Sequence, residues 1–142
     1  MGERGIAPWF AGPLGIEPKD VIKKANEETL LIIQMESVEA YEQIDEILKV
    51  EHYDVLLVGP TDLSASLGVP GQIHHPKVEN MMLDVAKKVK GSGKALATTF
   101  FDPEHCRRWI REGYRMMNVG SVLMLGTVNT KKIFHELREE FS

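Results

Sequence analysis

The sequence has little of what several protein classes require. Its 142 residues include one cysteine, Cys106, which excludes an internal disulfide and is typical of a reducing compartment. No apolar run approaches the ~20 residues of a membrane-spanning helix. The N-terminus carries acidic Glu3 and no continuous apolar segment, so it is unlike a signal peptide. We therefore expect a cytoplasmic protein with no membrane partner.

Basic residues are also in deficit. The chain has 17 Lys and Arg against 21 Asp and Glu, a formal charge of −4. Binding to nucleic-acid phosphates needs a concentrated basic face, so we expect no nucleic-acid partner. We interpret the group of Lys87, Lys88 and Lys90 as the solvated side of a helix. A hydrophobic content of 43% is sufficient for the core of one globular domain.

Short apolar runs alternate with helical periodicity along the chain, after a Gly/Pro-rich loop over residues 1–18. The runs predict four strands. Leu30 to Ile33 is expected to be buried on both faces and Val55 to Val58 is a second buried strand; Ala95 to Thr99 and Met116 to Val119 follow. The periodic segments predict five helices: Lys19 to Asn26, Val38 to Val50, Lys77 to Lys90, Pro103 to Glu112 and Thr130 to Phe141. This alternation predicts an α/β fold with a parallel sheet and right-handed crossovers.

Four βα units are half of a (β/α)₈ barrel, which takes about 250 residues. Two architectures follow from this count. The strands form an open sheet with two exposed edges, or they belong to a larger barrel.

Two carboxylates follow neighbouring predicted strands. Glu36 ends the run from Leu30, and Asp62 comes shortly after the run from Val55. Functional groups collect at the carboxyl ends of parallel strands, and paired carboxylates suit Mg²⁺ or Mn²⁺. The alternative is that Glu36 caps the helix beginning near Val38 and that Asp62 is the N-cap of a turn over Leu63 to Leu67.

The residues before Asp62 indicate a turn that approaches a ligand closely. Gly59 permits close backbone approach, and the amides of Thr61, Asp62 and Leu63 would face outward toward a carboxylate. A metal beside such a turn suits a 2-oxo acid. Taken without the rest, Gly59 and Pro60 signal only a loop.

Four ordered segments carry a family resemblance. They are ANEETLLIIQMES (Ala25 to Ser37), VLLVGPTDLSASLGVPGQIHHPKV (Val55 to Val78), GKALATTF (Gly93 to Phe100) and VGS (Val119 to Ser121). In order and spacing they resemble the HpcH/HpaI aldolase family. The resemblance implies that residues 1–142 are a partial domain of that family, the C-terminal half of a TIM (β/α)₈ barrel.

The resemblance also implies an activity and a site. The activity is that of a divalent-metal-dependent aldolase, which cleaves or forms a C–C bond in a 4-hydroxy-2-oxo acid to give pyruvate and an aldehyde. Glu36 and Asp62 would bind Mg²⁺ or Mn²⁺, with Co²⁺ a further candidate. Gln34 would be the active-site glutamine, with a catalytic role and a role in binding the substrate. Gly59, Pro60, Thr61 and Asp62 would bind pyruvate, with its carboxylate on the amides of Thr61 and Asp62.

The sequence also departs from the family pattern, and these departures bear on whether this chain alone has the implied activity. The family's general-base His and substrate-binding Arg lie in the first half of its barrel and have no counterpart here. Val122 stands where the family often has an acidic residue, and Thr98 and Thr99 occupy the loop that faces the aldehyde. We therefore expect a homo-oligomer, or a partner chain that supplies the first half of the barrel, with Thr130 to Phe141 packing across subunits.

Two other functions stay open from the sequence. One is a non-catalytic or split half-barrel subunit. The other is a CoA-thioester lyase of the citrate-lyase-β or malyl-CoA type, although such enzymes need further basic residues for the thioester.

Overall fold

The structure, a computed structural model, describes residues 15–141 and divides them into two compact units at Leu31 and Ile32. The first unit contains the 3-10 helix η3 (Pro18–Asp20) and helix α1 (Val21–Glu28). The second contains all the strands of the described chain. Most of the Gly/Pro-rich loop expected over residues 1–18 lies outside the described residues. No helix within residues 15–141 is long and apolar enough to cross a membrane.

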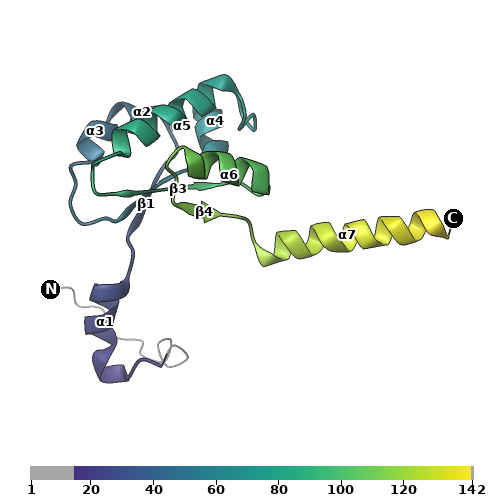
Figure 1. The fold of residues 1–142 in the computed structure, drawn as a ribbon, viewed down its shortest axis with the longest axis horizontal. Coiled ribbons are helices and arrows are strands. Elements are labelled where there is room, and N and C mark those ends of the chain that lie inside the picture. Colours follow the sequence, from purple (N-terminus) through teal and green to yellow (C-terminus); the bar gives the residue numbers. More distant parts are fainter. Residues whose placement is uncertain (1–14, 142) are drawn as a thin grey trace. The chain divides into compact units, whose positions relative to one another are not determined.

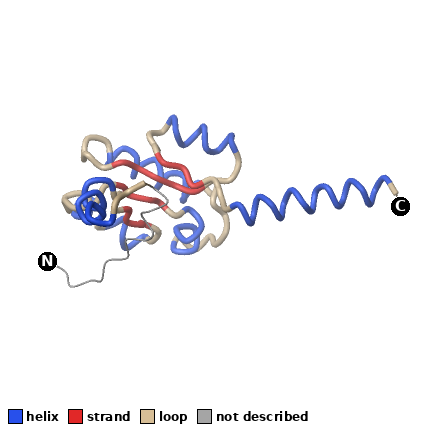
Figure 2. Tube along the Cα trace, turned by 90° about the horizontal axis from the view of Figure 1, so that it is seen from below, coloured by secondary structure: helices blue, strands red, loops and turns tan. Residues whose placement is uncertain are grey.

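The second unit is built on a parallel sheet of four strands, drawn in red in Figure 2. The strands are β1 (Ile32–Met35), β2 (Val55–Val58), β3 (Ala95–Thr99) and β4 (Met116–Asn118), and they lie side by side in that order. Met35 lies opposite Val58, and Val58 lies opposite Thr98. This register confirms the predicted parallel α/β fold and brings the carboxyl ends of the strands to one edge.

Helices follow each strand. They are α2 (Val38–Glu42), α3 (Ile44–Ile47), α4 (Pro60–Ser66), α5 (Pro76–Val89), α6 (Pro103–Arg111) and α7 (Val122–Glu140). Figure 1 shows α2 to α6 on one side of the sheet. Polar caps fix where several of them begin, because a side-chain oxygen satisfies an otherwise unpaired amide. Asp102 caps α6, accepting a hydrogen bond from the His105 amide at 2.9 Å.

The core lies between the sheet and these helices. It is formed by alternate strand residues and by one face each of α5 and α6, and includes Met35, Leu56, Val58, Leu96, Val78, Met82, Val85, Val89, Cys106 and Trp109. The opposite face of the sheet is not covered in the same way, since Ile32 and Met116 are 38% and 42% exposed. The expected strand from Leu30 to Ile33, buried on both faces, is therefore wrong: β1 starts at Ile32, and Leu30 and Leu31 are exposed.

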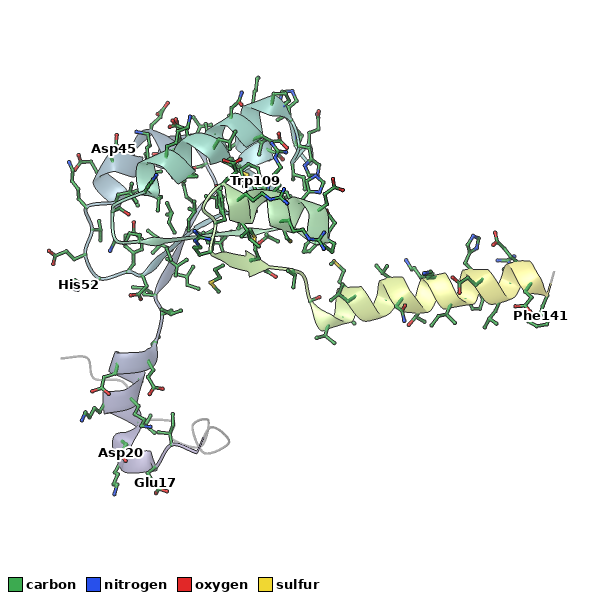
Figure 3. The ribbon with its side chains drawn as sticks, viewed as in Figure 1. Glu17, Asp20, Asp45, His52, Trp109 and Phe141 are labelled. Carbon is green, nitrogen blue, oxygen red and sulfur yellow. The ribbon has the colours of Figure 1, made fainter. Side chains whose placement is uncertain are left out.

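Two helical boundaries also differ from the prediction. The segment Val38 to Val50 forms two short helices that meet at Gln43, although it contains no proline or glycine that would indicate a break. The last helix begins at Val122 rather than Thr130, because the Ser121 hydroxyl caps it by accepting from the Met124 amide at 3.1 Å. None of its residues is buried, and Phe141 is labelled at its end in Figure 3.

Charged pairs join the outer helices to one another. Arg108 on α6 donates two hydrogen bonds to the carboxylate of Glu79 on α5, at 2.6 and 2.7 Å. These bonds hold the pKa of Glu79 below its usual range. Lys88 on α5 donates to both oxygens of Asp45 on α3, at 2.9 and 3.0 Å; Asp45 is labelled in Figure 3.

Adjacent residues of α6 separate the core from the surface. Trp109 is fully buried in the core (Figure 3), with its ring 5.8 Å from Phe100 and 5.3 Å from Tyr114. Ile110, the next residue, is 43% exposed and lies on the surface side of α6. We expect Trp109→Ala to lower the free energy of unfolding by about 3–5 kcal/mol, because it leaves a large cavity. Ile110→Ala should lower it by less than about 1 kcal/mol.

Urea unfolding followed by circular dichroism distinguishes the two variants. The matched control is Ile110→Ala, a truncation one residue away on the same helix. Equal losses in the two variants would contradict this assignment of the inner face of α6.

Candidate functional site

The side chains of Gln34 and Glu36 form a pair at the carboxyl end of β1. The Gln34 amide nitrogen donates a hydrogen bond to a Glu36 carboxylate oxygen at 2.6 Å. Alternate residues of a strand share one face, so both side chains lie on the same face as exposed Ile32, away from the core that buries Met35. Glu36 is thus held by a neutral donor on the sheet face that the helices leave uncovered.

Gly59 lies beside this pair on the neighbouring strand. Its amide donates to the Met35 carbonyl at 3.1 Å, which extends the ladder between β1 and β2 by one residue. A Cβ atom at position 59 would lie 3.1 Å from the Gln34 amide nitrogen and 3.1 Å from a Glu36 carboxylate oxygen. The glycine thus avoids a tight contact with these two side chains, while its backbone conformation (φ −91°, ψ 96°) is open to other residues.

The turn after Gly59 presents two unpaired amides. Pro60, which has no N–H, is the first residue of α4, and the Leu63 amide donates to the Gly59 carbonyl at 3.0 Å. Among the described residues, the amides of Thr61 and Asp62 make no hydrogen bond. Of the three outward amides expected from the sequence, Leu63 is thus occupied and two are free. Both Thr61 and Asp62 are exposed.

The capping roles considered for the two carboxylates are wrong. Ser37, not Glu36, caps α2, because its hydroxyl accepts from the Ala40 amide at 3.1 Å. Asp62 is not an N-cap either, since α4 begins two residues before it and has Gly59 as its cap residue. Neither Glu36 nor Asp62 therefore caps a helix.

Two serines of α4 join this helix to neighbouring segments of the site. Nothing in the sequence indicates their role. The Ser66 hydroxyl accepts a hydrogen bond from the Val38 amide at 2.9 Å, so α4 is joined to the segment that follows Glu36. The buried Ser64 hydroxyl donates to the Thr61 carbonyl at 2.6 Å and accepts from the Gly71 amide at 2.9 Å. Contacts between residues this far apart leave no local pattern in a sequence.

Thr98 and three of the histidines are engaged in contacts of their own. The side chain of Thr98 is buried in β3 and donates to the Val58 carbonyl at 3.0 Å, so its expected place in a loop facing the aldehyde is wrong. The ring of His74 stacks on that of His105, 4.0 Å apart, and His75 caps α5. Among residues 15–141, no group of three or more His, Cys, Asp or Glu side chains is placed to hold a metal ion.

Comparison with known proteins gives consistent matches. A family model described as HpcH/HpaI aldolase/citrate lyase matches residues 9–127. A 2-keto-3-deoxy-L-rhamnonate aldolase of Salmonella paratyphi B is 38% identical over 128 residues, which are 89% of this chain and 48% of the relative. The chain thus spans about half the length of the curated relatives that it matches.

Solved structures show the same relation. An HpcH/HpaI aldolase/citrate lyase family protein from Burkholderia cenocepacia has a TM-score of 0.79 at 33% identity, covering 96% of this chain and 53% of that one. An HpcH/HpaI aldolase from Desulfitobacterium hafniense has a TM-score of 0.73 at 28% identity, covering 94% and 53%. The four βα units superpose on about half of each structure, as predicted for half of a barrel.

The bond between Ser66 and Val38 gives the first prediction about this site. Ser66→Ala should leave the Val38 amide without its acceptor, at a cost of about 1 kcal/mol. Hydrogen exchange measured by NMR should then be about fivefold faster at Val38, since this free-energy difference corresponds to that factor. The Ala40 amide, which Ser37 caps, should not change.

A matched control is Ser92→Ala, which removes a serine hydroxyl that accepts from the Lys94 amide at 3.2 Å. This variant should leave exchange at Val38 unchanged. Unaltered protection of Val38 in Ser66→Ala would show that this bond does not hold the segment after Glu36.

Proposed function

The chain belongs to the HpcH/HpaI aldolase/citrate lyase family, and we propose that it carries the metal-binding and pyruvate-binding half of an aldolase site. The reaction is cleavage or formation of the C3–C4 bond of a 4-hydroxy-2-oxo acid, which gives pyruvate and an aldehyde. The substrate class follows from the relative named a 2-keto-3-deoxy-L-rhamnonate aldolase, since 2-keto-3-deoxy sugar acids are acids of this kind.

The arrangement of Gln34, Glu36 and Gly59 carries the proposal. A carboxylate is held at 2.6 Å by an amide and lies beside a glycine, where a Cβ would come within 3.1 Å of a carboxylate oxygen. The arrangement faces the uncovered side of the sheet, where a substrate has access. A side chain at position 59 would crowd this carboxylate, and the glycine leaves the space beside it open.

The donor set fits a hard divalent cation. Glu36 and Asp62 come from neighbouring strand ends, and Mg²⁺ is commonly bound by one or two carboxylates with waters and substrate oxygens at its other positions. Mn²⁺ and Co²⁺ accept similar ligands. The two residues would hold the ion, with Gln34 fixing the direction of the Glu36 carboxylate. When bound, the ion would act as a Lewis acid that stabilises negative charge developing on the 2-oxo group.

The free amides of Thr61 and Asp62 would hold the substrate carboxylate. Two adjacent N–H donors match the two oxygens of a carboxylate, and Ser64 fixes the turn by donating to the Thr61 carbonyl. Gly59 leaves the start of this turn without a side chain, and Pro60 fixes the backbone of the first helical residue. This contact would orient the 2-oxo acid, with its 2-oxo oxygen toward Glu36 and Asp62.

Proton transfer requires groups from outside these four βα units. In the described chain, His74 and His105 stack on each other and His75 caps α5, so none of these rings belongs to the pair of Glu36 and Gln34. We propose that further βα units, in the same polypeptide or in another subunit, supply the proton-transferring group and cover the open sheet face. The last helix, with its exposed apolar residues, would pack across subunits.

The two rival functions fit the molecule less well. A CoA-thioester lyase needs basic side chains near the carboxyl ends of the strands, and the curated relatives at this similarity are named as aldolases. A non-catalytic half-barrel subunit is consistent with the uncovered sheet face. It gives no reason for the space that Gly59 leaves beside Glu36.

Metal binding is the first test. Glu36→Gln and Asp62→Asn should each weaken Mn²⁺ binding at least tenfold, since each removes a charged ligand, with the affinity measured by titration calorimetry. Gly59→Ala should weaken it as well by displacing the Glu36 carboxylate. Glu39→Gln is the matched control, because Glu39 is an exposed carboxylate in the next turn of chain. Unchanged affinity in both ligand variants would contradict the metal assignment.

The second test measures pyruvate release. Residues 32–127 replace the corresponding segment of the Salmonella rhamnonate aldolase, and pyruvate release from 2-keto-3-deoxy-L-rhamnonate is followed with lactate dehydrogenase. The chimera should release pyruvate, and Glu36→Gln or Asp62→Asn should reduce the rate at least 100-fold while Glu39→Gln leaves it unchanged. A folded chimera that releases no pyruvate would argue against the aldolase assignment.

A further inference from the structure

A basic pocket lies at the opposite edge of the sheet from Glu36 and Asp62. It has a volume of about 420 Å³ and is lined by the end of α5, the start of β3 and the segment between α6 and β4. Its charged lining residues are Lys90, Lys94, Arg111, Glu112 and Arg115. Its lining residues come from the ends of α5 and α6, the start of β3 and the segments next to them, so the pocket lies within the four βα units.

Three of the four cationic side chains that line the pocket have no hydrogen-bond or ion-pair partner within the described residues. Among residues 15–141, the side chains of Lys90, Arg111 and Arg115 make no hydrogen bond or ion pair. Lys94 is fixed in the wall, since its ammonium donates to the carbonyls of Glu51 and Tyr53, at 3.0 and 2.7 Å, and lies 4.1 Å from the Tyr53 ring centre. By contrast, Arg108 and Lys88 nearby on the same helices are paired with carboxylates.

Helix dipoles do not account for this charge. α5 and α6 end here, and each C-terminus carries about −0.5 of a charge, which cations commonly neutralise. Adding the Glu112 carboxylate gives about −2 against the four cations, so an excess of about two positive charges remains. This excess is notable in a chain whose formal charge is −4.

We infer that this pocket binds a small phosphate-bearing anion. Arg111 and Arg115 offer planar guanidinium groups that can donate two parallel hydrogen bonds to phosphate oxygens, and Lys90 adds a point charge. A volume of about 420 Å³ exceeds what a bare phosphate fills and falls within the range of pockets for small organic ligands. The shared chemistry is the phosphate dianion, free or as part of a phosphorylated metabolite.

Titration calorimetry on the full chain tests this with inorganic phosphate, pyrophosphate and glucose 6-phosphate, at a constant ionic strength set with sodium chloride. We expect saturable binding with one site per chain. Arg115→Gln and Lys90→Gln should each weaken it about tenfold, which corresponds to about 1.4 kcal/mol. The melting temperature should rise with pyrophosphate in the unmodified chain and rise less in these variants.

Two matched controls separate this site from general attraction. Arg107→Gln lies on α6 and Lys87→Gln on α5, both exposed and outside the pocket lining, and both should retain the affinity. Glu36→Gln should also retain it, which separates this inference from the proposed function. Equal affinity for inorganic phosphate and glucose 6-phosphate would identify inorganic phosphate as the ligand, whereas tighter binding of the sugar phosphate would identify an organic one. Either result supports the site.

Three results would overturn the inference. The first is the absence of saturable binding of all three anions at millimolar concentration. The second is an equal loss of affinity in Arg107→Gln and Lys87→Gln, which would show that only diffuse charge is sensed. The third is binding that Arg115→Gln and Lys90→Gln leave unchanged, which would place the anion elsewhere on the chain.

Discussion

The register between β1 and β2 determines the chemistry at the carboxyl edge of the sheet. Because Met35 lies opposite Val58, the next residues on the two strands, Glu36 and Gly59, lie side by side. A slip of one residue would place a side chain beside Glu36 and turn Gln34 toward the helices. The core fixes this register, since Met35 and Val58 must both face the helices to be buried.

Helices pack on only one face of the sheet, and this affects both the stability of these βα units and the access of solvent to Glu36. The face toward α2 to α6 is a close-packed core, with Trp109 and Tyr114 among its largest side chains. The opposite face carries apolar residues such as Ile32 and Met116 that remain partly exposed. Burial of that face by further βα units would stabilise the fold and enclose Glu36 in the same step, since both are on that face. Stability and catalysis would therefore depend on the same contact.

The sequence predicts some parts of this structure better than others for physical reasons. It predicts β2 and β3 at their observed bounds, because central strands are apolar throughout and bordered by turn residues. It misplaces β1, because an edge strand that packs on one face gives a weaker signal and Leu30 extends the apolar run beyond the sheet. The positions of Gln34 and Glu36 at a strand end follow from the pattern. The bond between Ser66 and Val38 does not, since it forms only after the chain has folded.

The two edges of the sheet differ in charge because of how βα units are built. Each helix returns antiparallel to its strand, so helix N-termini gather at the carboxyl edge, and the C-termini of α5 and α6 gather at the amino edge. Cations near Val89 and Arg111 are therefore expected up to the charge of those termini. Glu36 and Asp62 take the carboxyl edge, where partial positive charge from the helices favours carboxylates. With Lys90 and Arg115, the positive charge at this edge exceeds the partial negative charge of the α5 and α6 C-termini. This surplus of positive charge distinguishes a binding pocket from ordinary helix capping.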